Sequence, residues 1–287
     1  MVAGWFSLEQ GGATAGDLLV RDVVCAWLRA RKIVHDVAQE RALGDGVDWF
    51  RVPPSAYTHL VFACGPVGPE LAVAELIERF TCCRRVAVNV SLVGDPAWRP
   101  FDLLLERDGL GSAKPDLAIT RPPGSAPVVA VVKIHPQGEH RGARPGIAHA
   151  AFDRLLAALE CAPFVVDTVL DASIPGRRST AEVQALLARA DVVLTTRLHG
   201  LILALAGGVP AVAIDPIMGG AKLLAQSRAL DWPASMTVDT VDDERLRQHF
   251  DWCRTRAARE RAVASRARGV QGAADVERML FAHLGRH

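Results

Sequence analysis

Short apolar runs alternate with segments of helical period along the whole chain, a pattern typical of strand–helix units that build a parallel sheet. In the first half the pattern predicts strands at 2–6, 33–37, 58–63 and 85–90, helices at 17–31 and 69–80, and short apolar runs at 103–105 and 117–119. In the second half it predicts strands at 128–134, 164–169, 192–194 and 211–214, helices at 147–160, 180–189, 198–206 and 221–230, and one or two helices over 242–284. The predicted fold class is therefore α/β.

Residues 121–127, with the sequence Arg-Pro-Pro-Gly-Ser-Ala-Pro, interrupt this alternation. Prolines and a glycine neither propagate a helix nor complete a central strand, so the segment is a candidate linker. We expect two doubly wound, Rossmann-like domains, 1–122 and 123–287, that face each other across a cleft. In such sheets, ligands bind beyond the carboxyl ends of the strands.

Composition narrows the range of partners. The 287 residues include 33 basic and 32 acidic side chains, and this near balance excludes nucleic acid or an anionic membrane as the main partner. The longest apolar run, 201–214, is broken by Gly-Gly-Val-Pro and is too short for a transmembrane helix. The first residues do not resemble a signal peptide, so we expect a cytoplasmic protein with its six cysteines reduced and buried. A homo-oligomer is compatible with these features.

The motifs of several enzyme classes are missing from the sequence. It contains no P-loop, no zinc-protease helix motif, no nucleophile elbow and no glycine fingerprint for a dinucleotide. It also lacks two aspartates spaced by one residue, which hold the metal-bound nucleotide in one class of glycosyltransferases. We therefore expect neither a catalytic metal nor a cofactor.

The candidate chemistry is concentrated at residues 191–210. A buried strand is predicted to end at Leu194, Thr195 or Thr196 is a candidate N-cap, and Arg197 and His199 fall in the first turn of the next helix. A guanidinium, an imidazole and free backbone N–H groups at the edge of a sheet suit an anionic ligand and proton transfer. The structural alternative is that both side chains satisfy helix-end carbonyls or a buried carboxylate.

Two of the four lysines fall at the ends of predicted elements. Lys222 follows the glycine-rich segment 215–221, which enters a helix and offers further backbone donors for an anion. Lys133 lies at the end of the predicted strand 128–134, and His135 follows two residues later. These side chains are candidates for the same anion pocket, and ordinary exposed loop positions are the alternative.

Several fragments together resemble the polysaccharide pyruvyl transferase family. The most specific is Thr196-Arg197-Leu198-His199-Gly200, followed by an apolar helix and Gly208-Val209-Pro210. The weaker fragments are informative through their order along the chain: Gly4-Trp5-Phe6, Gly16-Asp17, 59–66, Glu106-Arg107-Asp108 and Pro115-Asp116-Leu117-Ala118.

This resemblance implies a glycosyltransferase-B type fold and the transfer of pyruvate from phosphoenolpyruvate to a sugar hydroxyl pair as a cyclic ketal, in polysaccharide biosynthesis. Phosphoenolpyruvate is then the donor substrate, and no metal or cofactor is implied. Carried over to the matching positions, Arg197 holds the phosphate or carboxylate of the donor, the Leu198 backbone N–H assists beside Gly200, and His199 is the acid/base. Lys133 stands where the family often has an arginine.

The C-terminal domain is thus the expected donor side and the N-terminal domain the acceptor side. Asp17, at a helix start, is a candidate for binding sugar hydroxyls or for acting as a second base, with helix capping as its structural alternative. Gly16, Asn89 and Trp5 are further acceptor candidates, Trp5 as a stacking platform. Ala15 stands where the family usually has an asparagine.

Two other functions remain open at this point. A nucleotide-sugar glycosyltransferase of the same fold would use the same cationic edge for a diphosphate. A non-catalytic derivative would bind its ligand without turnover. The arginine-rich segment 245–268 indicates a solvated helix face, with a docking surface for a partner as the alternative.

Overall fold

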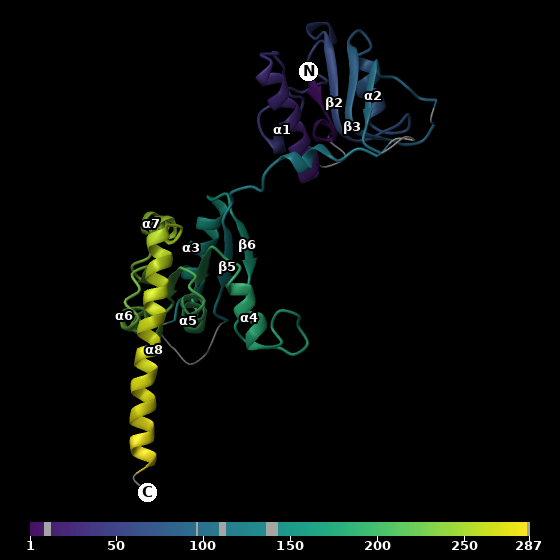
Figure 1. The fold of residues 1–287 in the computed structure, drawn as a ribbon. Helices are drawn as coiled ribbons and strands as arrows, with labels where there is room; N and C mark the ends of the chain where they lie inside the picture. Colours follow the sequence, from purple (N-terminus) through teal and green to yellow (C-terminus); the bar gives the residue numbers. More distant parts are fainter. Residues whose placement is uncertain (9–12, 96, 109–112, 136–142, 286–287) are drawn as a thin grey trace. The chain divides into compact units, whose positions relative to one another are not determined.

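The computed structural model describes residues 1–285 except 9–12, 96, 109–112 and 136–142 (Figure 1). The chain divides into two compact units, Met1–Gly124 and Ser125–His287. This division lies inside the proline-rich segment 121–127. The expected cleft between the two units stays a prediction.

The N-terminal unit contains a four-stranded parallel sheet in the order β1-β2-β3-β4. The strands are β1 (Val2–Ala3), β2 (His59–Val67), β3 (Arg84–Leu92) and β4 (Leu103–Glu106). The α-helices are α1 (Ala15–Ala30) and α2 (Val73–Arg79), and 3-10 helices cover Trp5–Ser7, Arg41–Leu43, Pro54–Ala56 and Leu117–Thr120. A parallel bridge between Val2 and Val37 places one further residue pair on the other side of β1.

Helix α1 forms where its sequence has both a start signal and an apolar face. Thr14 is its N-cap, and Asp17 completes a reciprocal pair of bonds with it. One side of the helix then buries Val20, Val23 and Val24 against β1 and β2. The start of α1 is thereby held close to the carboxyl ends of these strands.

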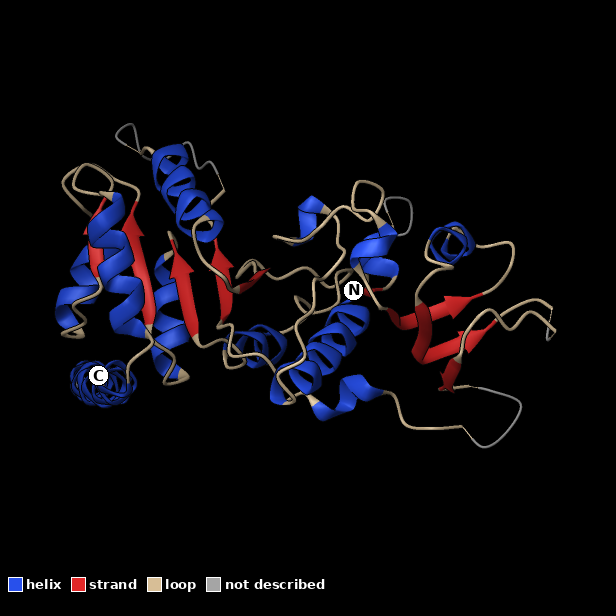
Figure 2. Cartoon of the chain, turned by 90° about the horizontal axis from the view of Figure 1, so that it is seen from above, coloured by secondary structure: helices blue, strands red, loops and turns tan. Residues whose placement is uncertain are grey.

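The C-terminal unit contains a five-stranded parallel sheet in the order β6-β5-β7-β8-β9. The strands are β5 (Val128–Val132), β6 (Ala162–Val165), β7 (Val192–Thr195), β8 (Ala211–Asp215) and β9 (Ser235–Thr237). The helices are α3 (Pro145–Ala157), α4 (Thr180–Leu187), α5 (Leu198–Ala206), α6 (Lys222–Ala229), α7 (Asp243–Cys253) and α8 (Arg256–Leu284). Helix α3 packs on α7, whereas α5 packs on α4, α6 and α8. Helices lie around the strands of this sheet (Figure 2). Because helices cover the sheet, the central strands β7 and β8 are wholly buried and read as continuous apolar runs.

The strand order of this sheet locates its ligand crevice. The chain passes from β5 to β6 on one side and then crosses to β7 on the other side. A doubly wound sheet with this order has its topological switch point at the carboxyl ends of the first and third strands, which here are β5 and β7.

The α/β class with two parallel sheets is confirmed, and most elements lie within a few residues of their predicted bounds. Segment 33–37 does not form a strand: Ile33 is 49% and Val34 98% exposed, and the segment meets the sheet at its end, where Val37 bridges Val2 of β1. Strand β1 ends at Ala3 because a 3-10 turn begins at Trp5, and the apolar run 117–119 is also a 3-10 helix. Strand β9 was not predicted because Met236 is its only large apolar residue.

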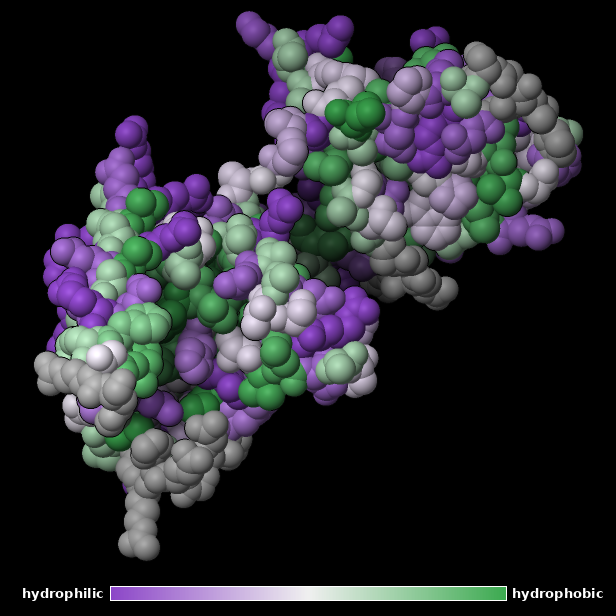
Figure 3. Space-filling view, turned by 60° about the horizontal axis from the view of Figure 1, so that its bottom comes forward, coloured by the Kyte–Doolittle hydropathy of each residue, from purple (hydrophilic) through white to green (hydrophobic). Residues whose placement is uncertain are grey.

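The cysteines agree in part with the expectation of burial. All six are free, and Cys25, Cys64, Cys83 and Cys253 are buried, but Cys82 is exposed and Cys161 half-buried. Hydrophilic side chains are spread over the visible surface, with smaller apolar areas between them (Figure 3). Across the described residues, no helix combines the length and apolarity needed to cross a membrane.

Candidate functional site

Strands β5 and β7 end side by side at the switch point, where Val132 pairs with Thr195. Two buried threonine hydroxyls fix the loops that follow. Thr195 Oγ1 accepts a hydrogen bond from the Arg197 N–H at 2.9 Å, and Thr196 Oγ1 accepts one from the Ile134 N–H at 2.8 Å. The backbone that carries the predicted donor site is therefore rigidly tied to both strands.

Helix α5 starts at this edge and rests closely on the strands. A Cβ on Gly200 would overlap the Thr195 hydroxyl and would lie 3.0 Å from Val132 Cγ1. Gly200 is thus required for the close approach of helix and sheet. This packing aims the first turn of α5 outward from the carboxyl ends of β5 and β7.

The first turn of α5 offers unused hydrogen-bond donors. Within the described part of the chain, the backbone N–H groups of Leu198, His199 and Gly200 have no protein acceptor. The His199 side chain is exposed and has no hydrogen bond or ion pair with any described residue. Free N–H groups at the positive end of a helix dipole form an anion site.

Arg197, the N-cap of α5, has its side chain fixed by protein groups at the end of β5 and after β6. Its side chain is only 11% exposed, Nε donates to the Lys133 carbonyl at 3.1 Å, and Nη2 lies 3.7 Å from Asp167 Oδ1. The same carboxylate accepts from His135 Nε2 at 2.7 Å and lies 3.5 Å from Arg177 Nη2. The guanidinium therefore has a carboxylate neighbour that is itself only 12% exposed, close to the structural alternative that the sequence had left open.

Asp167 was not identified from the sequence. Burial acts to raise the pKa of its carboxyl, but the Val169 N–H, His135 and the two guanidiniums outweigh that effect and lower the pKa. The carboxylate is thus ionised and compensates the positive charge beneath the site. It follows strand β6 by two residues, whereas the predicted strand 164–169 had placed it inside a strand, so the sequence offered no signal for it.

Lys133 and a further histidine lie on the α3 side of this edge. Lys133 Nζ contacts Asp153 Oδ1 at 2.5 Å, and the side chain is 30% exposed. His149, which the sequence analysis missed, has its Nε2 3.4 Å from Thr196 Oγ1. Burial, followed by the charge of Lys133, lowers the pKa of His149, so its imidazole is neutral at neutral pH.

A small cavity joins the predicted donor residues at the ends of β5, β7 and β8. Its lining includes His135, Thr196, Leu198, Asp215 and Lys222. The structure thus gathers His135, Leu198 and Lys222 around one opening. Residues 136–142, next to His135 in the sequence, lie outside the described part.

The loop before Lys222 differs from expectation. Asp215 is buried, and its Oδ2 accepts from the Ala221 N–H at 2.8 Å and from the Leu224 N–H at 3.0 Å. The Gly219 N–H donates to Asp239 Oδ1 at 3.0 Å. These carboxylates take up three backbone donors of the segment, whereas the N–H groups of Lys222 and Leu223 have no acceptor among the described residues, so an anion site here stays a prediction. The exposed Lys222 ammonium is what this loop contributes to the edge.

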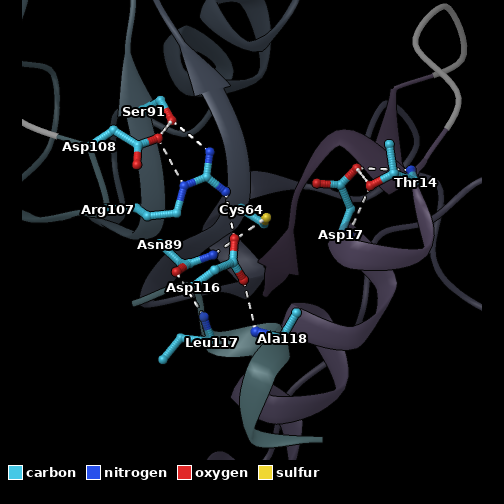
Figure 4. A network of polar contacts seen from close by, with 10 residues as sticks. All are labelled: Thr14, Asp17, Cys64, Asn89, Ser91, Arg107, Asp108, Asp116, Leu117 and Ala118. Atoms are coloured by element: carbon cyan, nitrogen blue, oxygen red, sulfur yellow. Dashed lines mark hydrogen bonds and ion pairs between the residues drawn. The ribbon is translucent and has the colours of Figure 1, made fainter. Parts of the chain in front are cut away.

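The acceptor candidates lie at the strand ends of the N-terminal unit (Figure 4). Asp17 Oδ2 accepts from the Thr14 N–H at 2.9 Å and from the Thr14 hydroxyl at 2.8 Å, so Asp17 is a helix-capping residue. The buried Cys64 thiol also has a side-chain hydrogen bond with Asp17. Burial, followed by this hydrogen bond, raises the pKa of Cys64 to about 12. Gly16 lies beside Asp17 in the first turn of α1.

Asn89 and Trp5 are likewise engaged with the protein. Asn89 Nδ2 donates to Cys64 Sγ at 3.6 Å, and its Oδ1 accepts from the Leu117 N–H at 3.1 Å. Both Asn89 and Cys64 have left-handed backbones, with φ of 59° and 68°. Trp5 donates from Nε1 to the Pro66 carbonyl at 2.9 Å, and its ring covers Gly65 so closely that a Cβ there would overlap it.

The Arg-Asp and Pro-Asp fragments form one network in the same unit. Arg107 contacts Asp116 at 2.6 Å, Asp108 at 2.9 Å and the Ser91 hydroxyl at 2.8 Å (Figure 4). Asp116 also caps the 3-10 helix through the Ala118 N–H at 2.8 Å. These fragments therefore fasten the strand ends of β3 and β4. Among the residues the structure describes, no group of His, Cys, Asp and Glu is arranged to hold a metal ion.

The protein was compared with curated proteins, with solved structures and with models of protein families. No curated protein matches the sequence. A solved structure described as the glycotransferase of kitacinnamycin is similar over 93% of this chain and 93% of that chain, with 14% identity and a TM-score of 0.35. A TM-score this low carries no argument, so the fold rests on the strand pairing given above.

The model of the polysaccharide pyruvyl transferase family matches residues 74–216. This stretch runs from α2 to the end of β8 and contains Asn89, Lys133, His135 and the segment 197–200. Trp5, Gly16, Asp17 and Lys222 lie outside it. By the match over residues 74–216, the chain belongs to the polysaccharide pyruvyl transferase family.

Proposed function

We propose that the protein transfers the pyruvate unit of phosphoenolpyruvate to a pair of sugar hydroxyls as a cyclic ketal, with the donor bound at the carboxyl edge of the C-terminal sheet. One observation carries this proposal: the first turn of α5 presents three unused N–H groups and the unpaired His199 imidazole at the switch point, in the described part of the chain. Family membership supports the reaction class.

The donor carries a phosphate and a carboxylate, and the edge offers complementary groups to both. The backbone N–H groups of Leu198 to Gly200 suit one anionic group, and the exposed Lys222 suits the other. Lys133 supplies a second ammonium, although Asp153 partly neutralises it. In this assignment Arg197 contributes its positive charge from beneath the site while Asp167 and the Lys133 carbonyl orient it.

The reaction requires proton transfers that an imidazole can perform. The methylene carbon of the donor gains a proton while one sugar hydroxyl loses its proton and bonds to C2. The second hydroxyl then bonds to C2, loses its proton, and the C2–O bond to phosphate breaks. His199 serves as acid for the methylene or as base for a hydroxyl, one role at a time. His135, exposed at the same edge, is the candidate for the other transfer.

The acceptor is assigned to the N-terminal unit, through Gly16, Asp17, Asn89 and Trp5. Asp17 and Asn89 are buried and paired with protein groups, so their first effect is to hold the strand ends in place. The half-buried Trp5 ring, fixed by its bond to Pro66, is the side chain of this set best suited to contact a sugar face.

Phosphate release from phosphoenolpyruvate, measured with a panel of sugar acceptors, tests the proposal. We expect His199→Asn to lower turnover by about 10²–10⁴-fold while the unfolding midpoint stays unchanged, because the ring is exposed and unpaired. His35→Asn, at a histidine of the N-terminal unit, is the matched control and should retain activity. Near-normal turnover in His199→Asn would overturn the assignment of His199.

A further inference from the structure

Helix α8 is only half covered by its own unit. Its 29 residues begin with Ala258, Ala262 and Ser265 buried against the body of the C-terminal unit. From Val270 to Gly285 every residue is exposed, and this half of the helix runs on past the neighbouring helices (Figure 1). An isolated helix of about 15 residues is marginally stable in water. The second half therefore needs a partner surface.

One face of this helix has the spacing of a coiled-coil seam. Its positions alternate by three and four residues, the heptad pattern of two packed helices. The seam consists of Val263, Arg266, Val270, Ala273, Glu277, Leu280 and Leu284. Its large apolar members Val263, Val270, Leu280 and Leu284 are 59%, 65%, 52% and 54% exposed. The seam is turned by about a quarter of a turn from the face that packs on the body, so it is free along its length.

The two charged seam residues differ from the other charges of α8. The arginines at 256, 259, 261, 268 and 278 each have an ion pair, and so do Glu260 and Asp275. Arg266 and Glu277 have neither an ion pair nor a hydrogen bond from their side chains within the described part of the chain. Two unpaired charges of opposite sign thus lie on an otherwise apolar or small-residue seam.

The seam is complementary to itself when a second copy runs in the opposite direction. A two-fold axis between Gln271 and Gly272 brings Arg266 opposite Glu277 of the second copy, and Glu277 opposite its Arg266. The same axis brings Val263 opposite Leu280, and Val270 opposite Ala273. The seam residues alternate between the a and d positions of the heptad. Each of these layers joins an a position of one copy to a d position of the other, as antiparallel coiled coils require. Parallel pairing would instead place like charges against each other.

We propose that α8 is a dimerisation helix, whose exposed half pairs with the same helix of a second copy of this chain as an antiparallel coiled coil. The Arg266–Glu277 contact occurs twice in the dimer and favours this register over the parallel one, in which Arg266 would face Arg266 and Glu277 would face Glu277. The partner is therefore a second copy rather than a different protein.

The molar mass of the full chain, measured by light scattering during size exclusion, tests this proposal. The wild-type chain should form a dimer. Arg266→Glu and Glu277→Arg should each weaken self-association by at least about tenfold, because each places like charges against each other in both 266–277 contacts of the dimer. An equimolar mixture of the two variants should form a heterodimer, since each of the two contacts then joins a glutamate of one copy to an arginine of the other.

Arg278→Glu is the matched control. It removes an exposed pair with Asp275 off the seam and should leave the dimer intact. Circular dichroism should show that all three variants remain folded. A monomeric wild-type chain, or a dimer unaffected by either single charge reversal, would overturn the proposal.

Discussion

At the carboxyl end of the N-terminal sheet the polar side chains bind one another, whereas at the corresponding end of the C-terminal sheet several donors have no protein acceptor. Asp17 is bonded to Thr14, Asn89 to Cys64 and Leu117, and Arg107 to Asp116 in the first region. In the second region the first turn of α5 and His199 have no acceptor among the described residues. Paired groups hold a backbone in place, and unpaired groups at a helix start are available for a ligand.

Substitutions in the two regions should therefore change different properties of the protein. Substitutions at the paired edge should mainly lower the free energy of unfolding. Substitutions of exposed groups at the unpaired edge should mainly change donor binding or turnover. The packing beneath the unpaired edge should still matter for stability.

The largest change in stability is expected from Gly200→Ala. The added methyl overlaps the Thr195 hydroxyl and would push α5 away from β7, which should cost about 3 kcal/mol of unfolding free energy. Gly146→Ala in α3 is the control, because a Cβ there meets no atom within 4 Å. Urea unfolding of both variants checks this. Equal midpoints would show that α5 does not rest on the strand as closely as described.

At the paired edge, Asn89→Ala should lower the unfolding free energy by about 2 kcal/mol, since it removes two side-chain bonds at a left-handed position. Asn89→Gly removes the same bonds but tolerates the backbone, so it should be less destabilising. Urea unfolding would measure both. If the two variants were as stable as the wild type while acceptor affinity fell, Asn89 would be a ligand contact rather than a structural residue.

Asp167→Asn should lower the unfolding free energy at neutral pH by about 1–2 kcal/mol, because the carboxylate compensates two guanidiniums. The pKa of Asp167 is lowered in the folded protein, so its contribution is present above the pKa of the unfolded chain and is lost as pH falls through the lower folded pKa. Unfolding midpoints compared from pH 7 to pH 3 should therefore converge on acidification. A gap that widened toward low pH would contradict this.

The smallest effect on stability is expected from Lys222→Ala. The side chain is exposed at the start of α6, so the unfolding free energy should change by less than about 0.5 kcal/mol. Affinity for phosphoenolpyruvate should fall by about tenfold through the loss of one charge-assisted contact. Isothermal titration calorimetry with phosphoenolpyruvate measures this affinity. Lys114→Ala, at an exposed lysine of the N-terminal unit, is the control. Unchanged affinity in Lys222→Ala would remove Lys222 from the donor site.

The sequence predicted those elements that follow from local periodicity, and those residues that come directly after a strand. Helix α5 was predicted with its observed bounds, because an apolar strand, two threonines and a glycine-delimited apolar helix follow one another. The gathering of Lys133, His135 and Leu198 at one edge followed from the rule for parallel sheets. The failed strand at 33–37 shows the limit of that method, because the apolar residues Ile33 and Val34 are exposed and the segment reaches the sheet at Val37.

What the sequence did not predict depends on contacts between distant segments. Asp167 neutralises Arg197 from a different strand end, and His149 reaches Thr196 from α3. Asp215 accepts from the Ala221 and Leu224 N–H groups on either side of Lys222, although this glycine-rich segment suited an anion site equally well when read alone. Whether a donor is free or occupied is a property of the folded chain, since it depends on which carboxylate the fold places beside it.

Thermal unfolding of the full chain, titrated with phosphoenolpyruvate and in parallel with UDP- and GDP-sugars, tests the donor site most directly. A ligand at 100 times its Kd stabilises the native state by about 2.7 kcal/mol, enough for a clear rise in Tm. We predict that phosphoenolpyruvate raises the Tm, that the nucleotide sugars do not, and that Lys222→Ala reduces the rise. A rise with a nucleotide sugar alone, or no response to phosphoenolpyruvate, would contradict the proposed donor site.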